Sequence, residues 1–197
     1  MTPGPAKQFD RDAVLEEATK VFWHHGYEAA GMSLLLERMG IGRQSLYDTF
    51  GDKRGLYLEA LDHYFRSRIA PVAALLRQPG RPLDNLFRAF EGLEQMVFSD
   101  GHVGDGCMFG NGLAEMSGDP EVASKLRRFL DSMEELFRET LEKAREAGEL
   151  ETPLSPTDLA RLLVNTFHGL ALLSKIDRNP GRAHGVMRAV RSLLRPS

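Results

Sequence analysis

Side chains that recognise DNA bases stand close together in one short segment of the 197-residue chain. Arg43 and Gln44 are adjacent, and arginine and glutamine read guanine and adenine through paired hydrogen bonds. Tyr47 and Lys53 follow them, and both residue types contact phosphates. This combination predicts a helix that turns one face toward the major groove of double-stranded DNA.

A glycine turn precedes this segment. Gly40-Ile41-Gly42 separates two short predicted helices, at about 32–39 and 43–49, and this arrangement is typical of a helix-turn-helix. The shape alone is weak evidence, because helix pairs joined by a glycine turn are common. The residues that we expect to face DNA are Ser33, Gly42, Arg43, Gln44, Ser45, Tyr47, Asp48, Thr49 and Lys53.

The same region resembles a known family. Residues 10–57 are similar to the DNA-binding domain of the tetracycline-repressor (TetR) family of transcriptional regulators. The segment GIGRQSLYDTFGDK, at 40–53, is the most specific part, and its spacing from Gly26-Tyr27 also fits. The resemblance is strong over about a quarter of the chain, and beyond residue 70 it concerns only the number and length of the helices.

The resemblance implies an all-helical homodimer. Three N-terminal helices would bind DNA, a fourth would act as a link, and the C-terminal helices would form a ligand pocket and a dimer interface. We expect a DNA-binding domain at 7–67 and a ligand-binding and dimerisation domain at 68–197. The implied function is that of a repressor which a small apolar molecule releases from a palindromic operator.

Two helix starts depart from the family pattern. Gly31 and Gly42 stand where the family usually has a hydroxyl residue that caps a helix, and Leu34 replaces an acidic partner. Glycine is an acceptable N-cap, but it has no hydroxyl to offer to a phosphate. Backbone N–H groups at the two helix starts can still meet phosphates.

The only cysteine, Cys107, follows Gly106 near a predicted helix start. Such a position lowers the pKa of a thiol and increases its reactivity. By resemblance to family members that sense electrophiles, an electrophile or redox sensor acting through Cys107 is an alternative to a reversible ligand. The other interpretation is a small buried side chain, because free cysteine is usually buried and inert.

Phenylalanine and methionine recur at helical spacing in the C-terminal part of the chain. Such residues usually form a core, and in this family part of the core encloses the inducer. The expected pocket residues are Phe65, Met96, Cys107, Met108, Asn111, Phe137, Asn165 and His168.

The last two long helices carry apolar faces, and by resemblance they pair with a second copy as a four-helix bundle. The expected interface residues are Leu159, Leu163, Phe167, Val186, Val190 and Leu194.

The composition favours an all-α fold. Hydrophobic residues make up 42% of the chain, and leucine and alanine greatly outnumber the β-branched types that favour sheets. Turn and cap signals predict about nine helices. They are a first helix capped by Asp10 and ended at Gly26, and helices at about 32–39, 43–49, 53–77, 83–98, 107–116, 120–147, 156–175 and 183–194.

Other classes of protein lack support in the sequence. The net charge is −3, so a strongly basic footprint is absent, and one cysteine excludes an internal disulfide. We find no catalytic constellation, metal-ligand spacing or cofactor motif, so an enzyme or small-molecule carrier is the weaker hypothesis. An architectural DNA-binding protein without an inducer is a further alternative. With neither a secretory signal nor an apolar run of membrane-spanning length, we expect a cytoplasmic protein without membrane contact.

Overall fold

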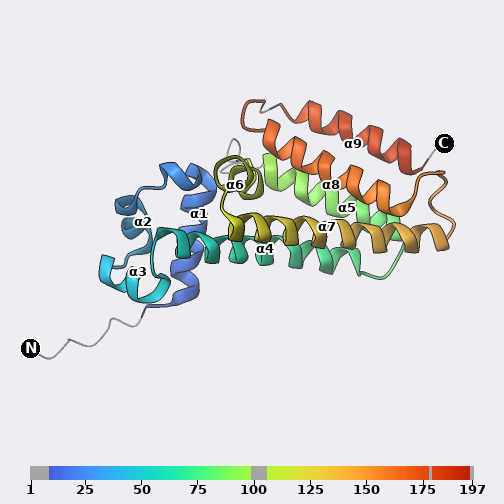
Figure 1. Ribbon diagram of the computed structural model, residues 1–197. Coiled ribbons are helices and arrows are strands. Elements are labelled where there is room, and N and C mark those ends of the chain that lie inside the picture. Colours follow the sequence, from blue (N-terminus) through green and yellow to red (C-terminus); the bar gives the residue numbers. More distant parts are fainter. Residues whose placement is uncertain (1–8, 99–105, 178, 196–197) are drawn as a thin grey trace, which may run out of the picture.

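The computed structural model describes residues 9–98, 106–177 and 179–195, and within these ranges the secondary structure is entirely helical (Figure 1). The all-α prediction is therefore confirmed. The helices are α1 (Arg11–Ala29), α2 (Met32–Met39), α3 (Arg43–Phe50), α4 (Lys53–Leu76), α5 (Pro82–Phe98), α6 (Met108–Met116), α7 (Pro120–Glu146), α8 (Pro156–Leu173) and α9 (Pro180–Leu194).

Capping side chains set most of the helix starts. Asp10 accepts a hydrogen bond of 2.9 Å from the Asp12 N–H, and Ser155 accepts one of 3.1 Å from the Asp158 N–H. The predicted start of the last helix, at about residue 183, is wrong. Asn179 caps α9 and Pro180 takes its first position, where a missing N–H costs nothing.

The first helix also differs from the prediction, because it does not end at Gly26. That residue has a φ of 79°, which kinks α1, and a last helical turn then continues to Ala29. Glycine is favoured at this kink because a positive φ is strained for other residues.

Helices α1 to α3 pack around a small apolar core at one end of the molecule (Figure 1). Leu35 and Leu46 are fully buried between them, and so is Phe22 of α1. The Phe22 ring meets Tyr57 of α4 edge-on, with 5.0 Å between the ring centroids. This contact attaches the three-helix head to the first part of α4.

The C-terminal helices form a bundle in which α4, α5, α7 and α8 run alongside one another, with α9 along one edge (Figure 1). Phe90 of α5 and Phe137 of α7 stack in its core at 5.3 Å, and both are almost completely buried. The 24-residue α4 belongs to both parts, because its first turns contact the head and its remainder packs in the bundle.

Helix α6 lies where the head meets the bundle, and it contacts α1 and α7 (Figure 1). A glycine permits this close approach. A Cβ atom at Gly112 would lie 2.8 Å from the Tyr57 hydroxyl and 3.4 Å from Leu126. The first distance is shorter than any ordinary contact, and Tyr57 is only 1% exposed, so its ring has little room to move.

We therefore predict that Gly112→Ala lowers the free energy of unfolding by about 1–3 kcal/mol, because it overpacks this junction. Gly92→Ala in α5 is the matched control, since a Cβ there meets nothing within 4 Å. It should raise the free energy of unfolding by about 0.5–1 kcal/mol through helix propensity. Urea titrations measure both values, and a Gly112→Ala protein as stable as the wild type would contradict the packing argument.

Candidate nucleic-acid interface and effector site

The turn between α2 and α3 is built on glycine backbone geometry. Gly40 has a φ of 65° and ends α2, and its N–H donates to the Glu37 carbonyl. Leu35 of α2 and Leu46 of α3 are both completely buried in the core of the head. This local geometry is that of the predicted helix-turn-helix.

The outer face of α3 presents polar side chains to solvent. Arg43, Gln44 and Asp48 are exposed, and Tyr47 is 42% exposed. The Gln44 amide donates to the Asp48 carboxylate at 2.8 Å, one turn along the same face. This hydrogen bond holds both side chains on the surface that a major groove would meet.

The starts of α2 and α3 are open. Gly31 and Gly42 occupy the N-cap positions, neither makes a side-chain cap, and both are exposed. The first N–H groups of both helices are therefore left for an external acceptor such as a phosphate. Ser33 is exposed in the first turn of α2, beside this position.

Three of the predicted DNA residues are half-buried. Ser45 and Thr49 lie at the edge of the α3 face, and Lys53 lies at the start of α4. The Lys53 ammonium is 4.5 Å from the centroid of the Tyr27 ring and donates to the Glu28 carbonyl at 3.4 Å. Cation–π contact and hydrogen bond together fix this positive charge near the end of α1.

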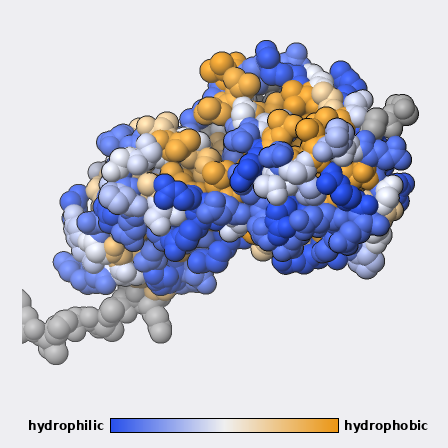
Figure 2. Space-filling view, turned by 45° about the vertical axis from the view of Figure 1, so that its right-hand side comes forward, coloured by the Kyte–Doolittle hydropathy of each residue, from blue (hydrophilic) through white to orange (hydrophobic). Residues whose placement is uncertain are grey.

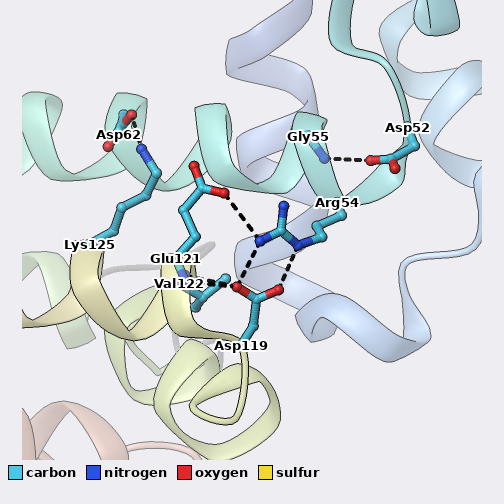
Figure 3. A network of polar contacts seen from close by, with 8 residues as sticks. All are labelled: Asp52, Arg54, Gly55, Asp62, Asp119, Glu121, Val122 and Lys125. Carbon is cyan, nitrogen blue, oxygen red and sulfur yellow. Dashed lines mark hydrogen bonds and ion pairs between the residues drawn. The ribbon is translucent and has the colours of Figure 1, made fainter.

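An ion-pair network joins the head to the bundle (Figure 3). Arg54 of α4 contacts both carboxylate oxygens of Asp119, at 2.5 and 2.8 Å, and the Glu121 carboxylate at 3.1 Å. Asp119 also caps α7, because its carboxylate accepts from the N–H groups of Glu121 and Val122. The hydrogen bonds from Arg54 and from these backbone groups lower the pKa of Asp119 to about 2.

A second contact from the same region reaches α1. The Glu115 carboxylate of α6 accepts a 2.9 Å hydrogen bond from the Glu28 N–H, just after the kink at Gly26. A Cβ at Gly26 would lie 2.1 Å from this carboxylate. The kink therefore makes room for Glu115 and turns a backbone N–H toward it.

Asn111 of α6, a predicted pocket residue, instead takes part in a series of hydrogen bonds that connects α6 to α1 and to Lys175. Its amide donates to the Trp23 carbonyl at 3.0 Å and accepts from the Lys175 ammonium at 2.6 Å. Trp23 in turn donates to the Gly106 carbonyl at 3.1 Å. These bonds occupy Asn111, so its burial is explained without a ligand.

Two of the predicted pocket residues, Phe137 and Asn165, have other surroundings. Phe137 stacks on Phe90, deeper in the bundle. Asn165 is exposed, and its amide donates to the Arg161 carbonyl at 2.9 Å, so it does not share the environment of His168 as its spacing suggested. Met108 is completely buried, and the side chain of Met96 lies outside the described residues.

The remaining three pocket residues are connected by aromatic contacts. Phe65 stacks on Phe129 with 4.2 Å between centroids, and Phe109 links Phe129 to His168 at 5.6 and 4.3 Å. The His168 Nδ1 atom is 3.9 Å from the Cys107 sulfur. Burial lowers the pKa of His168 to about 4, so its ring is neutral at pH 7.

The Cys107 thiol is enclosed at the inner end of this aromatic series. It is 6% exposed, and the Tyr64 hydroxyl lies 3.6 Å from its sulfur. Burial is typical of an inert structural cysteine, whereas a sensing thiol needs access to its reagent. The geometry therefore favours the packing interpretation of Cys107 over the sensor.

A groove opens between α4 and α7, at the Phe65–Phe129 end of this aromatic series. Its volume is about 710 Å³, and Phe65 and Phe129 contribute to its lining. The sequence analysis placed Phe65 in a pocket among several C-terminal helices, including the one that carries Phe137, but it did not specify a groove formed by α4 and α7 alone. No local sequence pattern indicates that α4 and α7 lie side by side, because the two helices are far apart in the sequence.

The residues predicted at a dimer interface are largely internal. Leu159, Leu163 and Leu194 have no exposed surface within a single chain, and Phe167 and Val190 are 8% and 6% exposed. Val186 is half-buried. These side chains form the core of one protomer, because the inward face of each helix carries the most regular apolar spacing.

Other apolar residues of α8 and its following turn are exposed instead. Leu162, Leu172 and Leu173 are 45%, 51% and 43% exposed, and Ile176 is 85% exposed. Leu162, Thr166, Gly169 and Leu173 follow one another at intervals of three or four residues, so they lie along one face of α8. Leu172 adjoins this face, and Ile176 belongs to the turn after the helix. Figure 2 shows hydrophobic patches on the surface of the C-terminal part of the molecule.

Two further findings limit the chemistry of the described residues. Among them, no group of three or more histidine, cysteine, aspartate or glutamate side chains is arranged to hold a metal ion. In the same ranges, none of the helices combines the length and hydropathy that a membrane crossing requires.

The junction gives a prediction for Asp119→Asn, which keeps a capping oxygen but removes the charge that faces Arg54. A lowered carboxylate pKa stabilises the fold above the unfolded-state pKa, and the effect disappears as the pH falls toward about 2. The variant should be less stable than wild type at pH 7, with the difference closing between pH 4 and pH 2. Urea titrations at these pH values test this, and a pH-independent difference would show that the charge is not responsible.

Comparison with known proteins agrees with this geometry. Residues 14–60 match the family model for bacterial regulatory proteins of the tetR family, and residues 82–190 match the model for a tetracyclin repressor-like C-terminal domain. The regulator YezE of Bacillus subtilis (strain 168) is 33% identical, with 91% of this chain and 93% of YezE covered. The repressor ComR of Escherichia coli (strain K12) is 28% identical, with 87% and 82% covered.

Solved structures show the same relationship. The TetR-family regulator CifR, with substituted cysteines and bound to 26-base-pair double-strand operator DNA, superposes with a TM-score of 0.82. It is 30% identical, and the match covers 96% of this chain and 99% of CifR. The helix-turn-helix head, the helical C-terminal domain and these matches agree, and the chain belongs to the TetR family of transcriptional regulators.

Proposed function

We propose that this chain is a homodimeric repressor that binds a palindromic operator and leaves it when a small molecule binds. Residues 7–67 would contact DNA and residues 68–197 would bind the effector and the second copy. The observation that carries the proposal is the exposed apolar face of α8, because one α3 helix reads only a half-site. A two-fold dimer presents two such helices to a palindrome.

The α8 face suits a second copy of this chain. Leu162, Leu172, Leu173 and Ile176 would bury apolar surface against the same residues of a partner. Gly169 lies between them, and a Cβ there would meet nothing within 4 Å, so two helices can approach closely. An isologous contact of this kind is self-complementary.

Repression is supported by the relatives. ComR is named as a transcriptional repressor, and CifR was solved on its operator DNA. The exposed Arg43, Gln44 and Tyr47 provide base and phosphate contacts of the types that such a complex requires. The open starts of α2 and α3 add backbone donors for phosphates.

Release follows from linkage between two conformations. A ligand releases DNA only if it binds more tightly to the form that cannot hold both half-sites. Helix α4 extends from the head into the bundle, and Arg54 ties its first turn to the start of α7. A ligand that shifts α4 against α7 would therefore change the spacing of the two α3 helices.

Selection from random DNA should yield a palindrome whose half-sites lie about one helical turn apart. On that sequence, Arg43→Ala should weaken binding by about 1–3 kcal/mol and relax one base position, because it removes a base contact. Lys53→Ala should weaken binding to all sequences alike and reduce the salt dependence. Equal losses on selected and random DNA for Arg43→Ala would contradict its role as a base reader.

The dimer gives a separate prediction. Leu172→Glu should dissociate the protein into folded monomers and reduce operator binding at the same time, because it places two charges in an apolar contact. Leu154→Glu is the matched control, since Leu154 is 40% exposed but lies on the loop before α8. Sedimentation and circular dichroism measure assembly and folding, and a dimeric Leu172→Glu protein would rule out this face.

A further inference from the structure

The two helices that form the groove, α4 and α7, pack in a defined register. The two helices lie side by side and run in the same direction (Figure 1). Asp62 pairs with Lys125, and one turn further along Phe65 stacks on Phe129. The groove of about 710 Å³ falls in the size range of small-molecule sites.

The floor of the groove is apolar. Phe65, Phe129 and Ala73 are 6–7% exposed, and Leu136 is 9% exposed, so their side chains close the groove from below. Ile69 is half-buried beside them. An alkyl chain or an aromatic ring would therefore remove mostly carbon surface from water here.

Two cations flank the aromatic stack. Arg66 and Arg128 adjoin Phe65 and Phe129 in the chain, line the groove and are exposed. Considering only the residues that the structure describes, neither guanidinium has a carboxylate within 4.0 Å. Both therefore keep their full donor capacity.

The other charged groups of the lining are largely offset. Lys125 pairs with Asp62, and Glu135 is engaged by Arg138, whose hydrogen bond lowers the Glu135 pKa. Arg77 and Glu139 remain, one of each sign, toward the later turns of the helices. The free positive charge is thus concentrated at the Phe65–Phe129 end.

We infer that this groove binds an amphipathic organic carboxylate, with its head between Arg66 and Arg128 and its apolar part along Ile69, Ala73 and Leu136. A guanidinium matches a carboxylate through two parallel hydrogen bonds, and the apolar floor accepts the tail. The inference rests on the proposed function, because it assigns a chemical class to the effector of that function.

The position of the groove connects such a ligand to DNA binding. The Asp62–Lys125 pair lies at the end of the groove, and the Arg54–Asp119 pair lies two turns earlier on α4 (Figure 3). A ligand that spreads α4 from α7 would pull on both pairs. Arg54 lies at the beginning of α4, next to α3, so the head would turn relative to the bundle.

Three probes with one tail and different heads test the inference: decanoate, 1-decanol and decylamine. Equilibrium dialysis of the full chain gives the dissociation constant of each probe. Decanoate should bind at least tenfold more tightly than 1-decanol, and decylamine should bind most weakly.

The Arg66→Gln/Arg128→Gln variant should abolish the tenfold preference for decanoate. Arg127→Gln is the matched control, because Arg127 is exposed on α7 but does not line the groove, and it should keep the preference. Absence of decanoate binding, equal binding of decanoate and 1-decanol, or a preference that survives the double substitution would each overturn the inference.

The same samples separate this inference from the proposed function. Decanoate should raise the dissociation constant for the selected operator in wild type and in Arg127→Gln. In the double variant, the concentration of decanoate needed for the same rise should be at least tenfold higher. If wild type fails to bind any selected DNA, the repressor proposal fails, whereas the decanoate preference still tests the groove. If 1-decanol alone binds and releases DNA, the repressor proposal stands and the carboxylate assignment is wrong.

Discussion

The arrangement of the N-terminal head relative to the C-terminal bundle depends on the Asp119 carboxylate, which both caps α7 and pairs with Arg54. The Asp119 carboxylate accepts hydrogen bonds from the first N–H groups of α7 and from two nitrogen atoms of the Arg54 guanidinium. Its side chain is 17% exposed, so the pair is partly shielded from water. A bidentate contact of this kind fixes an orientation as well as a distance. The start of α4 is thereby held in a defined relation to the start of α7.

Helix α6 supports the same junction with short, directional contacts. Glu115 accepts from a backbone N–H after the kink of α1, and Asn111 donates to the carbonyl of Trp23. These hydrogen bonds to main-chain groups attach α6 to α1 at two points. The head is therefore connected to the C-terminal bundle through both α4 and α6.

The three surfaces to which we assign functions occupy separate parts of the molecule. The outer face of α3 is polar and lies at one end, whereas the apolar face of α8 belongs to the bundle (Figures 1 and 2). The groove between α4 and α7 lies on a third surface and has an apolar floor with arginines beside it. Helix α4 borders both the head and the groove, so the proposed coupling between ligand and DNA would pass through this helix.

The sequence by itself determined most of the helices and the helix-turn-helix, because caps, glycine turns and amphipathic spacing act between residues close in the chain. The segment 40–53 carried the family resemblance for the same reason. Only the tertiary structure decided which apolar face of α8 is internal: Leu163 is buried and Leu162 is exposed, although both are leucines on one helix. It also decided the Arg54–Asp119 pair and the groove, since their partners are more than 60 residues apart and helical periodicity contains no information about which distant helix lies opposite.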